Sequence, residues 1–160
     1  LFVSIFLLFF LTPYSFANVS VCFTPPSKCG NFIVEQIKEA KRSIYIQAYG
    51  FTSEKIIDAL IEAKNRGVEI EIILDRSNFH KKKQNVIKLL ENNQIKIHQD
   101  KVAGIAHNKV MIIDNTTVIT GSFNFTDNAD KRNAENVIVL HDSNVAQQYY
   151  DNWRKRNNKK

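Results

Sequence analysis

The sequence HNKVMIIDNTTVITGSFN, residues 107–124, contains two short runs of β-branched residues on either side of a turn-forming segment. The runs at residues 108–113 and 117–120 favour extended backbone, because Val, Ile and Thr pack well on a pleated sheet. The Asp114-Asn115-Thr116 segment between them has the composition of a tight turn. We therefore predict a β-hairpin here, and the rest of the chain is organised around it.

Upstream of this hairpin, patterns typical of helices and of strands alternate along the chain. This order predicts an α/β sandwich in which a mixed sheet is flanked by helices on both faces. With 160 residues in all, we expect one domain over residues 18–160. Helices are predicted over residues 31–40, 54–66, 80–92 and 143–153, and further strands over residues 43–51, 68–75, 95–98 and 136–140.

The first 17 residues, LFVSIFLLFFLTPYSFA, contain no charged side chain and end in Ser15-Phe16-Ala17, which fits a signal peptidase site. We expect an export signal that is cleaved after Ala17 and, because no starting methionine or basic segment precedes the apolar run, truncated at its start. A membrane anchor is the alternative, but the run is at the lower length limit of a spanning helix and Pro13 interrupts it. The predicted location is therefore outside the cytoplasm, either secreted or periplasmic.

Cys22 and Cys29 are the only cysteines and flank the turn-forming segment FTPPSK. In an oxidising compartment an even number of cysteines favours a disulfide, which we predict here. A zinc site is the weaker alternative, because no second pair of Cys or His residues stands nearby to complete four ligands.

The formal net charge of +6 favours an anionic partner. Nucleic acid and an acidic membrane surface both satisfy this condition, so the charge does not choose between them.

His107 and Lys109 are two residues apart, so on an extended strand they point to the same face. A neutral imidazole can attack phosphorus and form a covalent phosphohistidine, which divides a difficult displacement into two easier steps. Lys109 would stabilise the charge that builds on the non-bridging oxygens in the transition state. Ser122 and Asn124, again two apart, would supply further donors to the same phosphate.

A nucleophilic histidine needs its other ring nitrogen held by an acceptor, because the tautomer decides which nitrogen is free to attack. Asp114 and Glu135 are the two candidates. Asp114 points away from His107 in an unbroken strand and sits where the turn begins, whereas Glu135 opens the next strand. The predicted catalytic residues are therefore His107, Lys109, Glu135 as the orienting carboxylate and Asp114 in a supporting role, as a turn cap or an ion pair.

Residues 107–124 fit, without departure, the pattern H-x-K-x4-D-x6-G-S-x-N of the phospholipase D superfamily. The similarity extends from about residue 31 to the final helix. In particular, the chain resembles the short exported bacterial endonucleases of that superfamily, down to GSFNFT at 121–126 and NAEN at 133–136. The matching residues are His107, Lys109, Asp114, Gly121, Ser122 and Asn124.

This resemblance implies how one motif works in a short chain. Superfamily members use two motifs, one histidine as nucleophile and the other as general acid, and single-motif chains pair as homodimers. This chain has one motif, so we expect a homodimer whose active site straddles a two-fold axis. We expect no metal or other cofactor, because the family works without one and the HNK segment offers no second ligand at metal-binding spacing.

Three functions are compatible with these residues. A metal-independent nuclease with little sequence preference is slightly favoured by the basic charge and by the resemblance. A phospholipase D that releases the headgroup of a phospholipid, for example choline, to leave phosphatidic acid is the alternative, favoured by the superfamily chemistry and by export. A binding protein without catalysis is disfavoured by the intact motif. The first two functions would share one phosphohistidine mechanism.

Overall fold

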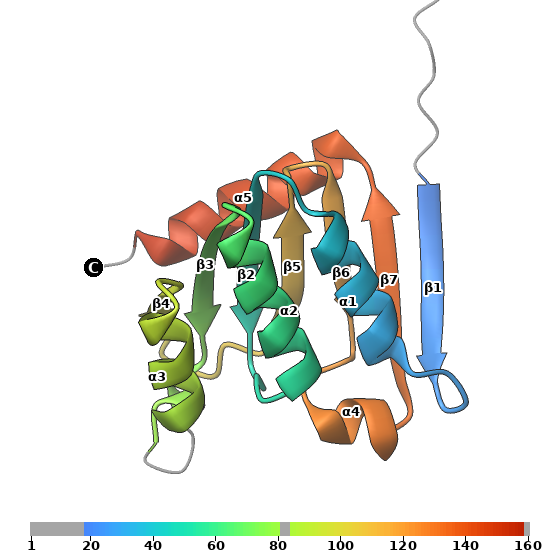
Figure 1. Ribbon diagram of the computed structural model, residues 1–160, viewed down its shortest axis with the longest axis horizontal. Helices are drawn as coiled ribbons and strands as arrows, with labels where there is room; N and C mark the ends of the chain where they lie inside the picture. The colour runs from blue at the N-terminus through green and yellow to red at the C-terminus, as the bar shows by residue number, and fades with distance from the viewer. Residues whose placement is uncertain (1–17, 81–83, 159–160) are drawn as a thin grey trace, which may run out of the picture.

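Seven strands form one mixed sheet in the computed structural model, which describes residues 18–80 and 84–158. The strand order is β1-β7-β6-β5-β2-β3-β4, and Figure 1 shows α1 and α2 in front of the sheet and α5 behind it. The predicted α/β fold class, with helices on both faces, is therefore confirmed. The strands are β1 (Asn18–Thr24), β2 (Ser43–Ala48), β3 (Glu69–Leu74), β4 (Lys96–Gln99), β5 (Lys109–Ile113), β6 (Thr117–Gly121) and β7 (Glu135–His141). The helices are α1 (Cys29–Glu39), α2 (Glu54–Asn65), the 3-10 turn η1 (Arg76–Asn78), α3 (Gln84–Asn92), α4 (Asp127–Lys131) and α5 (Ser143–Asn157).

The predicted export signal falls on residues 1–17, which lie outside the described residues. Within the part of the chain that the structure does describe, no helix is both long and apolar enough to cross a membrane.

The predicted hairpin is formed by β5 and β6 at the centre of the sheet. The strands pair antiparallel from Ile113 opposite Thr117 to Val110 opposite Thr120. Asp114 and Asn115 connect them with φ angles of 53° and 56°, and Asp and Asn tolerate this left-handed conformation better than most residues. All five residues of β5 are buried, as expected for a central strand.

Two hydrophobic cores lie on opposite faces of the sheet, because successive side chains of a strand alternate between faces. Met111 packs in the larger core, which includes residues of α1 and α2, whereas Ile112 packs in the smaller core with Trp153 of α5. The indole N–H of Trp153 also donates to the carbonyl oxygen of Ile46 at 3.0 Å, which ties α5 to β2.

Three elements were not predicted from the sequence, and one of them is the short η1 turn at Arg76–Asn78. Strand β1 pairs antiparallel with β7 at the edge of the sheet, and α4 is a short helix between β6 and β7. The predicted disulfide is present: Cys22 of β1 is bonded to Cys29, the first residue of α1. This bond holds the edge strand to the helix layer that follows it in the chain.

We expect the disulfide to stabilise the fold locally. The closed loop is short, so the chain-entropy model gives about 2.5 kcal/mol of unfolding free energy. Reduction with dithiothreitol, or replacement of both cysteines by Ser, should lower the free energy of unfolding in urea by about this amount without abolishing folding. The double variant should then be insensitive to dithiothreitol, and equal stability of oxidised and reduced wild-type protein would contradict the prediction.

Candidate active site

The predicted site residues meet at one edge of the sheet because of strand direction. Lys109 is the first residue of β5, Ser122 directly follows β6, and Glu135 is the first residue of β7. Since β6 runs antiparallel to both of its neighbours, the beginnings of β5 and β7 lie beside the end of β6. His107, two residues before β5, reaches the same edge.

Lys109 is buried, with 7% of its surface exposed. Its ammonium group donates to the backbone carbonyl of His107 at 2.9 Å and lies over the ring of Tyr49, 5.4 Å from the ring centroid. Burial lowers the pKa of this ammonium below its ordinary value, while the negative charge of Glu135 opposes the shift. A phosphate that enters here would meet a cation with little competing water, which strengthens their attraction.

The imidazole of His107 is exposed and packs against Tyr49, with ring centroids 4.7 Å apart. The backbone on both sides of this histidine is held by hydrogen bonds. The amide of Ala106 donates to a carboxylate oxygen of Asp75 at 2.8 Å, and the carbonyl of Asn108 accepts from the amide of Tyr49 at 3.0 Å. The imidazole therefore projects from a fixed segment.

Glu135 is bound by neutral donors. Ser122 Oγ donates to one carboxylate oxygen at 2.5 Å, and the Asn133 amide donates to the other at 2.9 Å. Its own backbone amide donates to Thr24 Oγ1 at 3.2 Å, so β1 also supports the site. Among the residues that the structure describes, His107 is not a hydrogen-bond partner of this carboxylate within one chain.

Asn124 and Gly121 both lie against the backbone of a neighbouring segment. The Asn124 side chain accepts from the amide of Gly50 at 3.3 Å, which places it beside the end of β2. Gly121 has a φ of 146°, and a Cβ there would lie 2.3 Å from the carbonyl oxygen of Asn136. Only glycine fits this position, where β6 passes close to the backbone of β7.

Asp114 lies at the opposite end of β5 from Lys109, so the structure does not bring it to His107. Its carboxylate accepts from the backbone amides of Lys41, Arg42 and Ser43 at 2.9, 2.7 and 2.9 Å. Although burial raises its pKa, these hydrogen bonds together lower the pKa below the ordinary value. Asp114 thus connects the central hairpin to the loop between α1 and β2.

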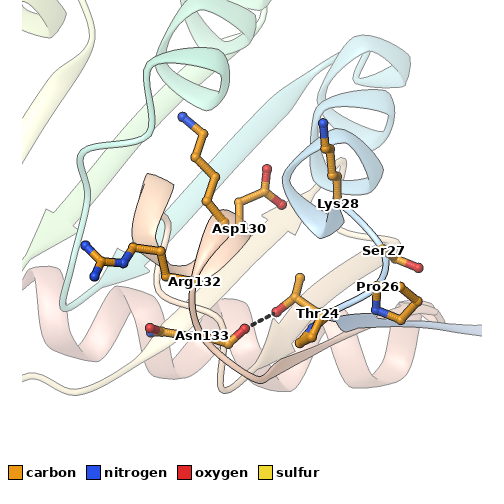
Figure 2. A pocket seen from close by; sticks show the side chains of 9 residues that line it. Thr24, Pro26, Ser27, Lys28, Asp130, Arg132 and Asn133 are labelled. Carbon is orange, nitrogen blue, oxygen red and sulfur yellow. Dashed lines mark hydrogen bonds between the residues drawn. The ribbon is translucent and has the colours of Figure 1, made fainter.

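A pocket of about 270 Å³ lies beside the site, between the β1–α1 loop and the residues that follow α4. Figure 2 shows the hydrogen bond that joins Thr24 Oγ1 to the carbonyl of Asn133 on its wall. Lys28 and Arg132 line the pocket as well, although their cationic ends point in different directions in this view.

Several supporting residues were not predicted from the sequence, namely Thr24, Tyr49, Asp75 and Asn133. The signals available in the sequence were the carboxylate of Asp75 at the end of an apolar strand pattern and the polar Asn133 close to Glu135, since polar groups placed there need partners. No three His, Cys, Asp or Glu side chains group as a metal site in the described residues 18–80 and 84–158.

Known proteins resemble this chain in sequence and in fold. A family model described as "Cardiolipin synthase, PLD-like domain" matches residues 33–156. A phospholipase D of Rickettsia prowazekii is 55% identical over 148 residues, covering 91% of this chain and 71% of that protein. A mitochondrial cardiolipin hydrolase of Chlamydomonas reinhardtii is 33% identical, covering 79% of this chain and 57% of that protein. Among solved structures, the phospholipase D family member Nuc of Salmonella typhimurium superposes with a TM-score of 0.83 at 36% identity, covering 88% of this chain and 93% of Nuc.

The fold and the site together define a hydrolase domain of the class that acts on phosphodiesters. More specifically, the chain belongs to the phospholipase D superfamily, as its motif predicts.

We predict that Asp114 acts on stability. Asp114→Ala removes the acceptor of three amides and should lower the free energy of unfolding at neutral pH by about 2 kcal/mol. Because the pKa of this carboxyl is depressed in the folded state, its stabilisation is present above the ordinary pKa of 3.8 and disappears as the pH falls through the folded value. Urea unfolding at several pH values measures this difference.

Asp114→Asn is the matched variant, because it keeps one oxygen acceptor and should lose less stability than Asp114→Ala. Folded Asp114→Ala should retain turnover. A variant with wild-type stability and no turnover would instead place Asp114 in the chemistry.

Proposed function

We propose that this protein hydrolyses phosphodiesters through a covalent phosphohistidine on His107. The observation that supports this most is that the buried ammonium of Lys109 and the imidazole of His107 both pack against Tyr49 at one sheet edge, where the ammonium also donates to the backbone carbonyl of His107. These two groups supply the nucleophile and the charge stabilisation by themselves, so we propose a reaction that is independent of metal ions.

The reaction would proceed in two displacements. A neutral nitrogen of His107 attacks phosphorus, and the bond from phosphorus to the leaving oxygen breaks as that oxygen takes a proton from a second, protonated histidine. Water then attacks the phosphohistidine and passes a proton back to the second histidine. The phosphorus–nitrogen bond breaks, which restores His107 and releases the phosphomonoester. Lys109, Ser122 and Asn124 would bind the non-bridging oxygens in both steps.

The second histidine is proposed to be His107 of the partner subunit in a homodimer. Val19, Val21 and Phe23 of β1, together with Ile138 of β7, form an exposed apolar surface that we call the β1–β7 surface. Phe23 adjoins Thr24, which binds the amide of Glu135, so this surface reaches the incomplete site. A second copy seated there would bury apolar area and bring the two sites together. In the assembled site, Glu135 would orient a histidine ring.

We propose phospholipid as the substrate class. The 55% identical relative is a phospholipase D, and the more distant one is a cardiolipin hydrolase. Ile105, two residues before His107, is 58% exposed, which places an apolar side chain next to the site. The net charge of +6 favours nucleic acid as the second candidate substrate. The disulfide supports export to an oxidising compartment, where either substrate would be met.

The first test compares substrates with a purified chain that begins at Asn18. In EDTA, the wild-type protein should release choline from phosphatidylcholine vesicles, and His107→Ala should lose activity by several orders of magnitude, because the nucleophile is gone. His141→Ala is the matched control, since His141 pairs with Thr117 at the far end of the sheet. Plasmid DNA offered in parallel decides between the two substrates.

Cleavage of DNA without release of choline would overturn the phospholipid proposal and support the nuclease. Loss of all activity in EDTA, with recovery on adding a divalent metal, would contradict the metal-free mechanism.

The shared site predicts that an inactive subunit suppresses an active one. Wild-type chain refolded with a threefold excess of His107→Ala should keep about a quarter of its activity per wild-type subunit, because most wild-type chains then have an inactive partner. Refolding with a threefold excess of His141→Ala should cause no such loss. Sedimentation should show a dimer, and a fully active monomer would contradict the shared site.

A further inference from the structure

Tyr49 packs against both of the groups to which the proposed chemistry is assigned. Its ring centroid is 4.7 Å from that of the His107 imidazole, with an angle of 60° between the planes. The same ring lies 5.4 Å from the ammonium nitrogen of Lys109. One aromatic side chain therefore contacts both the nucleophile and the cation.

The position of Tyr49 is set by its backbone. Its amide donates to the carbonyl of Asn108, and its carbonyl accepts from the side-chain amide of Asn78 at 2.6 Å. Asn78 is itself buried, in the η1 turn that Asp75 begins. Since Asp75 also binds the amide of Ala106, one turn holds both Tyr49 and the segment that leads to His107.

This arrangement addresses two physical requirements of the site. An exposed imidazole can rotate among several orientations, and a packed ring reduces that freedom and keeps the attacking nitrogen aligned. The buried ammonium of Lys109 loses water, and the negative face of an aromatic ring partly replaces the lost solvation. The Tyr49 ring provides both effects at once, because it contacts the imidazole and the ammonium together.

We propose that Tyr49 is a positioning residue for His107 and Lys109, and that its aromatic ring, not its hydroxyl group, is the part that acts. This inference rests on the proposed function of His107 and Lys109. Tyr49 would therefore affect the rate of the chemical step. It would not affect binding of the parts of the substrate that are distant from phosphorus.

Variants of Tyr49 that remove or keep the aromatic ring distinguish a positioning role from a purely structural one. Tyr49→Phe keeps the ring and should keep kcat within about twofold of wild type, whereas Tyr49→Leu should lower kcat by about tenfold or more with little change in KM. Single-turnover measurements should assign the loss to formation of the phosphohistidine. Tyr49→Met repeats the ring deletion with an unbranched side chain and serves if Tyr49→Leu does not fold.

Tyr45→Leu is the matched control. Tyr45 lies within β2, four residues before Tyr49, and packs away from the site against Tyr150 and Trp153, with ring centroids 4.8 Å away in each case. Replacing Tyr45 removes its ring contacts with Tyr150 and Trp153 and leaves the surroundings of His107 unchanged. Tyr45→Leu should therefore lower thermal stability and leave kcat near that of wild type.

Proton NMR of the His107 ring provides a readout that does not depend on turnover. The ring current of Tyr49 should displace the carbon-bound imidazole signals, and the displacement should persist in Tyr49→Phe and vanish in Tyr49→Leu. A kcat in Tyr49→Leu no lower than in Tyr45→Leu would overturn the positioning role. Equal losses in Tyr49→Phe and Tyr49→Leu would also overturn it, because the hydroxyl group would then be the acting part. Full activity of His107→Ala would refute the proposed function separately, whatever the NMR result.

Discussion

The antiparallel pairing of β5, β6 and β7 is the constraint on which the site depends. It brings the start of β5, the end of β6 and the start of β7 to one edge, so Lys109, Ser122 and Glu135 meet although they lie far apart in the sequence. Asp114 stabilises the opposite end of the same hairpin through the backbone of residues 41–43. The motif therefore contains the residues of the proposed chemistry at one end of β5 and a residue that stabilises strand placement at the other, which explains why its aspartate is separated from its histidine.

Much of the secondary structure could be predicted from local sequence patterns. The β-branched runs with the Asp114-Asn115 turn identified the central hairpin, and helical periodicity identified α1, α2 and α5. The site residues of the motif were proposed from their spacing and from the family resemblance, and the structure brings Lys109, Ser122 and Glu135 to one sheet edge. Strand β1 was missed although Val19, Val21 and Phe23 alternate with Ser20, Cys22 and Thr24, a period typical of a strand. In the structure these apolar side chains are exposed at the edge of the sheet. Helix α4 has only five residues, too few to show a helical period.

The supporting contacts could not be predicted for a different reason. Tyr49 reaches His107 only because β2 pairs with β5 in a register that places Ala48 opposite Lys109. A shift of one residue in that register would turn the strand over and remove the contact, yet no local pattern specifies the register. The role of Asp75 could not be predicted either, because it depends on the path of the loop that brings the Ala106 amide to its carboxylate. Glu135 illustrates the limit well, because its position at the start of the next strand was predicted from the sequence but its hydrogen bonds to Ser122 and Asn133 were not.

Charge gives a physical reason for two copies to share one substrate. A single chain presents a buried Lys109 ammonium whose pKa is lowered by desolvation, with Glu135 as its main electrostatic support. Two such sites brought together across a two-fold axis would place two ammonium groups near each other, and their repulsion would lower the pKa values further. A bound phosphodiester carries the negative charge that removes this conflict, and the charge that develops on its oxygens in the transition state is stabilised most strongly where water is excluded. The dimeric site would thus stabilise the transition state, which carries more charge on those oxygens, more strongly than the bound substrate, which is the condition for catalysis.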